Sequence, residues 1–199
     1  MFLLLKTSYK INMTEKQIEL LEKRLIFESQ KYCGMEPDYI RKENDLNFCL
    51  DFFGKNEVDY SIVHTLLINS IKNKKEMEFD LLLMLLEHFN ITKDFDLILS
   101  ELLIQPWHHF HDRIANILNF DRNNDTIDYL YKGALYSCEN LAYQSDYCEF
   151  NRKCLYALAK IGTTEAINYI EKIAICDNLL VSQYANNILK EFGYQKHMR

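Results

Sequence analysis

Apolar residues recur every three or four positions along most of the chain, and no stretch keeps the strict alternation of a half-buried strand. Thr14 and Gln17 have capping-box spacing in front of an apolar stripe that begins at Ile18. Further helices are predicted over residues 37–53, 57–72, 77–90 and 94–105. The pattern predicts an all-α chain of about ten helices joined by short loops.

Glycine and proline mark the predicted helix ends. Gly34 and Gly54 suit helix C-termini, Pro37 suits a first helical turn, and Pro106 ends the helix that precedes it. With only 5 Gly and 2 Pro in 199 residues, a turn-rich β protein is disfavoured. Segment 77–90 is apolar on nearly every face, which predicts neighbours on several sides.

The C-terminal half contains an internal repeat, in which segment 155–162 matches segment 186–193. The aligned positions are Leu158 with Leu189, Ile161 with Phe192 and Gly162 with Gly193. A second helix, predicted over 163–175 and capped by Thr163 or Thr164, lies between the two segments. Upstream, the segment that starts at Ile127 aligns with the one that starts at Ile167. One helix pair therefore recurs with a period of about 30 to 40 residues.

Over about residues 107–193 this pattern resembles the HEAT-like repeat family. The residues that carry the resemblance are Ala157, Leu158, Ile161, Gly162, Ala166, Ile170, Val181, Ala185, Leu189 and Gly193. More narrowly, segments 107–112 and 152–158 look like small bacterial HEAT-repeat proteins, some of which resemble immunity proteins that block a toxin by binding it. The resemblance implies a right-handed α-α superhelix, or solenoid, whose exposed ridge binds another protein.

The repeat divides the chain into three parts. Residues 1–13 are expected to be a loose leader, and Met13 is an alternative start to Met1. Residues 14–106 match the repeat poorly and are expected to be degenerate repeats or a helical cap. Residues 107–199 are expected to hold the HEAT-like repeats.

Composition and charge narrow the class of protein. A hydrophobic content of 48% and a charged content of 26% are typical of a globular chain. The formal net charge of -6 and the lack of a long basic cluster disfavour nucleic acid or an anionic membrane as partner, whereas a basic protein partner suits it. The six cysteines include no CxxC pair, and we find no signal peptide or membrane span in the sequence. We therefore expect a cytoplasmic protein with reduced thiols. We also expect it to be a monomer.

The segment Trp107–Asp112 is the most unusual stretch, because His108, His111 and Asp112 have helical spacing. A metal site needs three or four convergent ligands, and no further ligands are suitably spaced, so neither metal nor cofactor is expected. One interpretation is structural, with Trp107 in the core and the polar residues capping helices; the other is an interface hot spot. The predicted partner-binding residues are Trp107, His108, His111, Asp112, Tyr143, Asp146, Tyr147, Arg152 and Tyr156.

Known catalytic and calcium patterns do not fit. Segment 121–125 lacks Gly at the sixth position, where Thr126 stands, and Glu at the twelfth, where Lys132 stands, so a turn capped by Asn124 or Asp125 is expected instead of a calcium loop. No P-loop, nucleophile elbow or HExxH occurs. We therefore expect a non-enzymatic protein-binding module. One alternative is an immunity protein against a basic toxin domain, and the second is a scaffold or chaperone-like adaptor. A HEAT-like DNA glycosylase is the third alternative, which the single Trp and the acidic charge disfavour.

Overall fold

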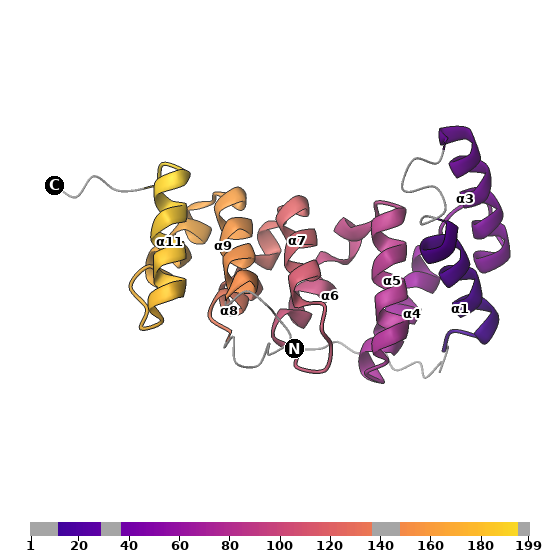
Figure 1. Cartoon of the computed structure of the whole chain (residues 1–199), viewed down its shortest axis with the longest axis horizontal. Coiled ribbons are helices and arrows are strands. Elements are labelled where there is room, and N and C mark those ends of the chain that lie inside the picture. Colours follow the sequence, from indigo (N-terminus) through magenta and orange to yellow (C-terminus); the bar gives the residue numbers. More distant parts are fainter. Residues whose placement is uncertain (1–11, 29–36, 137–147, 195–199) are drawn as a thin grey trace. The chain divides into compact units, whose positions relative to one another are not determined.

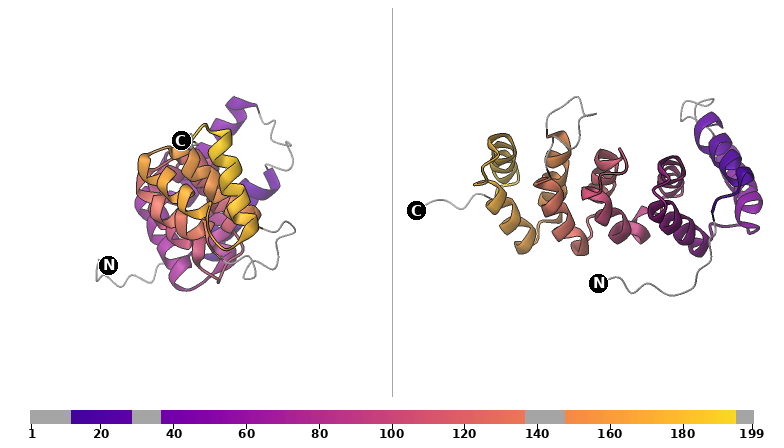
Figure 2. Two further views of the ribbon diagram at one scale, coloured as in Figure 1. Left: turned by 90° about the vertical axis from the view of Figure 1, so that its left-hand side faces the viewer. Right: turned by 90° about the horizontal axis from the view of Figure 1, so that it is seen from below.

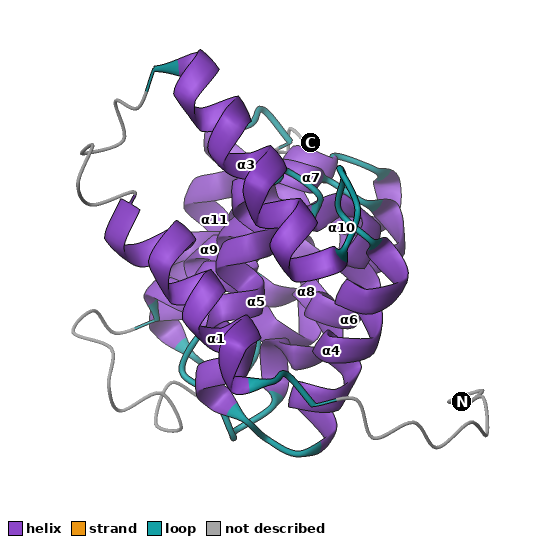
Figure 3. Ribbon diagram, turned by 90° about the vertical axis from the view of Figure 1, so that its right-hand side faces the viewer, coloured by secondary structure: helices purple, strands orange, loops and turns teal. Residues whose placement is uncertain are grey.

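Figure 1 shows the computed structural model of the chain, which describes residues 12–28, 37–136 and 148–194. Within these ranges all regular structure is helical, with ten α-helices and no strand (Figure 3), so the predicted all-α class is confirmed. The chain forms two compact units, Met1–Ile91 (unit 1) and Thr92–Arg199 (unit 2). The division predicted between residues 106 and 107 was drawn on the repeat pattern, and it stays a prediction about the extent of the repeat.

Unit 1 begins with the predicted capping box. Its elements are α1 (Glu15–Leu21), the π-helix η1 (Glu22–Glu28), α3 (Asp38–Phe53), α4 (Tyr60–Lys72) and α5 (Glu76–His88). The Gln17 amide donates to the Thr14 hydroxyl at 3.2 Å, and the Thr14 amide donates to Gln17 Oε1 at 3.0 Å. Pro37 is the N-cap of α3, and Gly54 ends it in the left-handed conformation, both as predicted. Gly34 lies outside the described residues.

The centre of unit 1 is α5, whose buried side chains lie on several of its faces, as the sequence predicts. They are Phe79, Leu81, Leu82, Leu83, Leu85 and Leu86. Hydrogen bonds to Asp45 join η1, α3 and α5. Asp45 Oδ1 on α3 accepts from Arg24 Nη2 of η1 at 2.7 Å and from His88 Nε2 of α5 at 2.7 Å.

Unit 2 combines α-helices with 3-10 turns. Its elements are the 3-10 helix η2 (Thr92–Phe95), α6 (Asp96–Glu101), η3 (Leu102–Ile104), α7 (His111–Asp121), η4 (Asn124–Thr126), α8 (Ile127–Ala134), α9 (Glu149–Ile161), α10 (Thr164–Ile173) and α11 (Leu179–Glu191). The single helix predicted over 94–105 is wrong, because 3-10 turns replace its two ends. No side chain caps α6 at Phe95, and the Gln105 amide bonds three residues back, to Leu102.

The helices of unit 2 pack in two rows. In one row α7 packs against α9, and α9 against α11; in the other α6 packs against α8, and α8 against α10 (Figures 1 and 2). Helices that align in the sequence repeat are thus neighbours within a row. Gly162 is the C-cap of α9 and Gly193 follows Phe192, the C-cap of α11, and both have the left-handed conformation, with φ of 68° and 73°.

Two tyrosines one repeat apart make the same contacts between helices of the second row. The Tyr129 hydroxyl of α8 donates to Glu101 of α6 at 3.2 Å, and the Tyr169 hydroxyl of α10 donates to Asp128 of α8 at 2.6 Å. An ammonium group lies near each ring centroid, Lys132 at 5.3 Å from Tyr129 and Lys172 at 4.9 Å from Tyr169. The sequence alignment of α8 with α10 therefore extends to side-chain contacts.

Candidate functional site

The Trp107–Asp112 segment is a turn that leads into α7, and its two central histidines lie inside unit 2. The rings of His108 and His111 stack at 4.3 Å, and each residue is 1% exposed. The Phe110 amide donates to His108 Nδ1 at 3.2 Å, so the His108 proton lies on Nε2, which donates to the Leu102 carbonyl at 3.0 Å. His111 Nε2 donates to the Gln105 carbonyl at 2.8 Å.

These contacts give the histidine pair a structural role. Both rings satisfy carbonyls at the end of η3, where Pro106 interrupts the helix and cannot donate. Burial lowers the pKa of His108 to about 4, and burial also lowers the pKa of His111, so both rings are neutral at pH 7. The structure therefore places both predicted partner-binding histidines in the interior, in the capping role that was the alternative interpretation. Trp107 is part-exposed, with its ring edge-on to His108 at 5.0 Å, so it lies at the rim of the core and does not fill it.

Of the other predicted residues, Arg152 and Tyr156 lie on one part-exposed face of α9, and Asp112 of α7 lies beside it. Glu149, Arg152, Lys153, Tyr156 and Lys160 follow i, i+3, i+4, i+7, i+11 spacing and are all part-exposed. We call these five residues the α9 stripe. Arg152 and Tyr156, which the sequence analysis selects, are both members of it.

Side chains of the α9 stripe reach both neighbouring helices of the row. Lys153 Nζ lies 3.0 Å from Asp112 Oδ2 of α7 and 2.9 Å from Glu149 Oε1. The Tyr156 hydroxyl donates to Glu191 Oε2 of α11 at 2.7 Å. Predicted residue Asp112 thus meets the stripe through Lys153.

Two cations of the α9 stripe lie against aromatic rings. The Arg152 guanidinium lies 5.9 Å from the Tyr184 ring centroid of α11, and Lys160 Nζ lies 5.6 Å from that of Phe120 on α7. Phe120 is 77% exposed. Such rings hold long cationic side chains in place while their charge faces water.

Sequence reasoning selected only part of this face. Lys153 and Lys160 carry a signal that it missed, because they continue the helical spacing of Arg152 and Tyr156. Phe120 and Tyr184 have no such signal, since they join the face through packing between helices. The predicted contacts Tyr143, Asp146 and Tyr147 lie outside the described residues.

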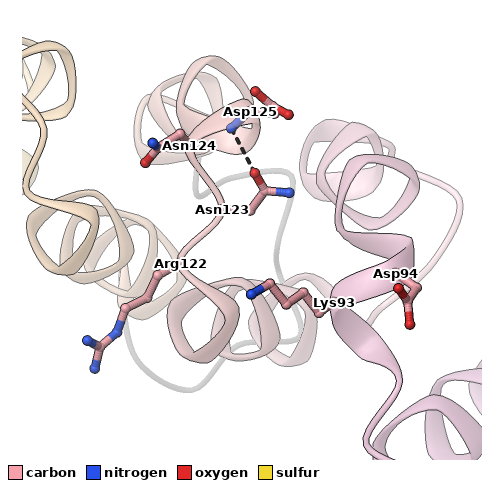
Figure 4. Close-up of a pocket in the computed structure, with 6 residues that line it drawn as sticks. All are labelled: Lys93, Asp94, Arg122, Asn123, Asn124 and Asp125. Atoms are coloured by element: carbon pink, nitrogen blue, oxygen red, sulfur yellow. Dashed lines mark hydrogen bonds between the residues drawn. The ribbon is translucent and has the colours of Figure 1, made fainter.

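A polar pocket of about 540 Å³ lies at the other end of α7 (Figure 4). Its lining residues are Lys93, Asp94, Arg122, Asn123, Asn124 and Asp125. The turn is capped by Asn123, whose side chain accepts from the Asp125 amide at 3.0 Å, so the expected cap at Asn124 or Asp125 is wrong by one or two positions. In Figure 4 the Lys93 amine points toward the middle of the pocket, whereas the Arg122 guanidinium extends away from it. Two basic residues, two acidic residues and two asparagines line the pocket, so its lining has no net charge that would select a ligand.

Over residues 12–28, 37–136 and 148–194, no group of three or more His, Cys, Asp or Glu side chains converges as metal ligands. No helix in the same ranges is both long and apolar enough to cross a membrane. No family model matches the chain, and neither the curated proteins nor the solved structures include a match.

Proposed function

We propose that unit 2 is a HEAT-like helical-repeat module, arranged as an α-α superhelix, that binds a protein partner through the α9 stripe and has no enzymatic activity. The two-row packing of sequence-equivalent helices supports the repeat assignment. The left-handed glycines after α9 and α11 and the matched contacts of Tyr129 and Tyr169 support it independently.

The observation that carries the binding proposal is the bracing of the α9 stripe by both neighbouring helices. Exposed Lys and Arg side chains usually lose much conformational freedom on binding, which weakens the complex. Here Arg152 and Lys160 already lie against aromatic rings, and Tyr156 is already hydrogen-bonded, so less freedom remains to be lost. Arg and Tyr are also the residue types enriched at binding hot spots.

The charges of the α9 stripe indicate the chemistry of the partner. The stripe holds three cations and one carboxylate, although the whole chain has a net charge of -6. Glu149 and Asp112 both pair with Lys153, whereas Arg152 and Lys160 lie near aromatic rings and form no salt bridge within the described residues. A protein surface with exposed carboxylates fits this face better than the basic partner expected from net charge alone. If the module is an immunity protein, its toxin would present an acidic face here.

The test compares partner recovery by the full chain and by two charge-reversal variants. The Arg152→Glu/Lys160→Glu variant reverses both cations of the stripe, and Lys132→Glu/Lys172→Glu reverses two cations of the other row as a matched control. We expect a partner that binds wild type and the control equally, binds the stripe variant at least about 100-fold more weakly, and binds wild type less tightly as salt is raised.

Equal recovery by all three chains would remove the proposal for this face. Recovery that disappears after nuclease treatment would also overturn it, because the bound molecule would then be a nucleic acid.

A further inference from the structure

Two carboxyl groups from different helices meet inside unit 2. Asp96 is the first residue of α6, is 1% exposed, and has both carboxyl oxygens buried without a hydrogen-bond partner. Asp121 is the last residue of α7, and its Oδ2 is buried without a partner as well. Helix α6 packs against α7, and the Asp121 carboxyl raises the pKa of Asp96. Because nearly all buried polar atoms in native proteins have a partner, this pair requires an explanation.

The surroundings of Asp96 compensate its charge only in part. Lys93 of η2 and the Asn123 side chain, just before η4, favour the charged form of Asp96, but burial and the Asp121 carboxyl oppose it more strongly. The charged residues on the neighbouring elements also include Asp125 of η4 and Asp128 and Lys132 of α8, whereas η3 has no ionisable residue. Two ionised carboxylates side by side in this setting would repel one another strongly.

We propose that Asp96 and Asp121 together bind a single proton, and that this proton keeps α6 seated against α7. A protonated Asp96 is a hydrogen-bond donor, and Asp121 Oδ2 is an acceptor. One proton therefore gives a partner to one oxygen of Asp96 and to Asp121 Oδ2. A divalent ion is a poorer occupant, since two carboxylates are a small ligand set and the described residues offer no third acidic, His or Cys ligand here.

The pKa of Asp96 places the change in protonation near neutral pH. Burial, followed by the interaction with Asp121, raises the pKa of Asp96 to about 7 from an ordinary value of 3.8. The folded state thus holds a proton that the unfolded chain releases. The stabilising contribution is complete below the unfolded pKa of 3.8 and is lost as pH rises through about 7.

Loss of the proton should loosen α6 rather than α7. Asp121 belongs to a helix of 11 residues that packs against α9, whereas α6 has 6 residues and is flanked by 3-10 turns at both ends. Short elements of this kind open at low free-energy cost. The proton site therefore acts as a pH-sensitive latch on the segment Thr92–Ile104.

The experiment measures thermal unfolding of the full chain between pH 6.5 and 8.5, together with amide hydrogen exchange in residues 92–104. We expect the wild-type midpoint to fall by about 5 °C relative to Asp96→Asn over this interval, and exchange in 92–104 to accelerate at the higher pH. Asp121→Asn should flatten the pH dependence as Asp96→Asn does. Asp94→Asn, which neutralises an exposed neighbour, should leave the wild-type slope intact.

The proposal is overturned if Asp96→Asn retains the wild-type slope, or if ¹³C NMR shows the Asp96 carboxyl titrating near pH 4. The NMR titration uses the wild-type chain, so it decides the question even if a variant fails to fold. A wild-type midpoint at pH 8 that rises with added Ca²⁺ or Mg²⁺, and falls with a chelator, would also overturn it, because the pair would then be holding a metal ion.

Discussion

The hydroxyl of Tyr194 donates to the carbonyl oxygen of Ala159 at 3.2 Å and so links the chain after α11 to the last turn of α9. A Cβ atom at Gly162 would lie 2.9 Å from that hydroxyl oxygen, whereas a Cβ at Gly193 would meet nothing within 4 Å. Both glycines have positive φ. The two positions therefore separate the cost of the backbone conformation from the cost of crowding.

We expect Gly193→Ala to lower the free energy of unfolding by about 1 kcal/mol, which is the cost of left-handed backbone for a residue with a Cβ. Gly162→Ala should cost about 2 kcal/mol, because it adds the contact with Tyr194. Urea unfolding of the two variants measures the difference. Repeating the pair in a Tyr194→Phe background should bring the two losses together, and a difference that persists there would contradict the assigned contact.

The repeat that we propose could be predicted from the sequence because its positions are local. Leu158, Ile161 and Gly162 recur as a group, and each has a backbone or packing role that any helix of this kind requires. Two of the five residues of the α9 stripe could be predicted for the same reason, since helical spacing alone places Arg152 and Tyr156 on one face.

What the sequence could not show depends on contacts between distant segments. Asp96 and Asp121 look like ordinary surface carboxylates until α6 and α7 bring them together. For His108 and His111 the sequence left a capping role and a binding role open, and it could not show that their rings bond to the Leu102 and Gln105 carbonyls next to Pro106. The local sequence pattern does not predict the Asp96–Asp121 pair or the carbonyl partners of the two histidines, because both depend on tertiary packing.

Asn151 on α9 provides a second prediction, because it caps the preceding helix of the other row. It is fully buried, and its Nδ2 lies 3.1, 3.0 and 2.9 Å from the carbonyl oxygens of Gly133, Ala134 and Tyr136. Asn151→Ala leaves these carbonyls without this donor and should lower the free energy of unfolding by about 2 to 3 kcal/mol.

The matched control for Asn151 is Asn186 on α11. Its Nδ2 also donates to backbone carbonyls, those of Ala174 at 3.0 Å and Ser182 at 2.9 Å, but Asn186 is exposed and water can replace it. Asn186→Ala should cost less than about 1 kcal/mol in the same unfolding assay. If both variants lose the same free energy of unfolding, burial of the asparagine does not determine the cost of removing its hydrogen bonds.

In unit 1 the critical ion pair is that of Arg24 with Asp45. Arg24 is 4% exposed, and Asp45→Ala would leave its charge buried without this partner, at a cost of about 3 kcal/mol. Asp51→Ala, at an exposed position of the same helix, should change stability by less than about 0.5 kcal/mol. Chemical unfolding followed by a probe within unit 1 measures both values, and a loss as small as that of Asp51→Ala would argue against the pair.

The same pair predicts acid sensitivity for unit 1. Burial raises the pKa of Asp45, but hydrogen bonds from His88 and Arg24 outweigh burial, so its pKa lies below 3.8. This contribution is present above pH 3.8 and is lost as pH falls through the lowered pKa. Asp45→Asn should therefore flatten the acid limb of unit 1 unfolding, and an unchanged limb would show that another group controls it.

His108 should give unit 2 a pH dependence opposite in sign to that of Asp96. Its pKa falls from 6.5 in the unfolded chain to about 4 in the folded state, so its contribution is complete above pH 6.5 and is lost as pH falls through about 4. In wild type the opposite pH dependences of His108 and Asp96 partly cancel between pH 4 and pH 6.5.

The Asp96→Asn background removes the contribution of Asp96, and there the unfolding midpoint should fall steadily from pH 6.5 to 4.5. Adding His108→Gln, which keeps a donor but does not titrate, should reduce that fall, whereas His109→Gln at the exposed neighbouring position should not. If His109→Gln reduces the fall as much as His108→Gln does, burial of the His108 ring is not the cause of the acid sensitivity.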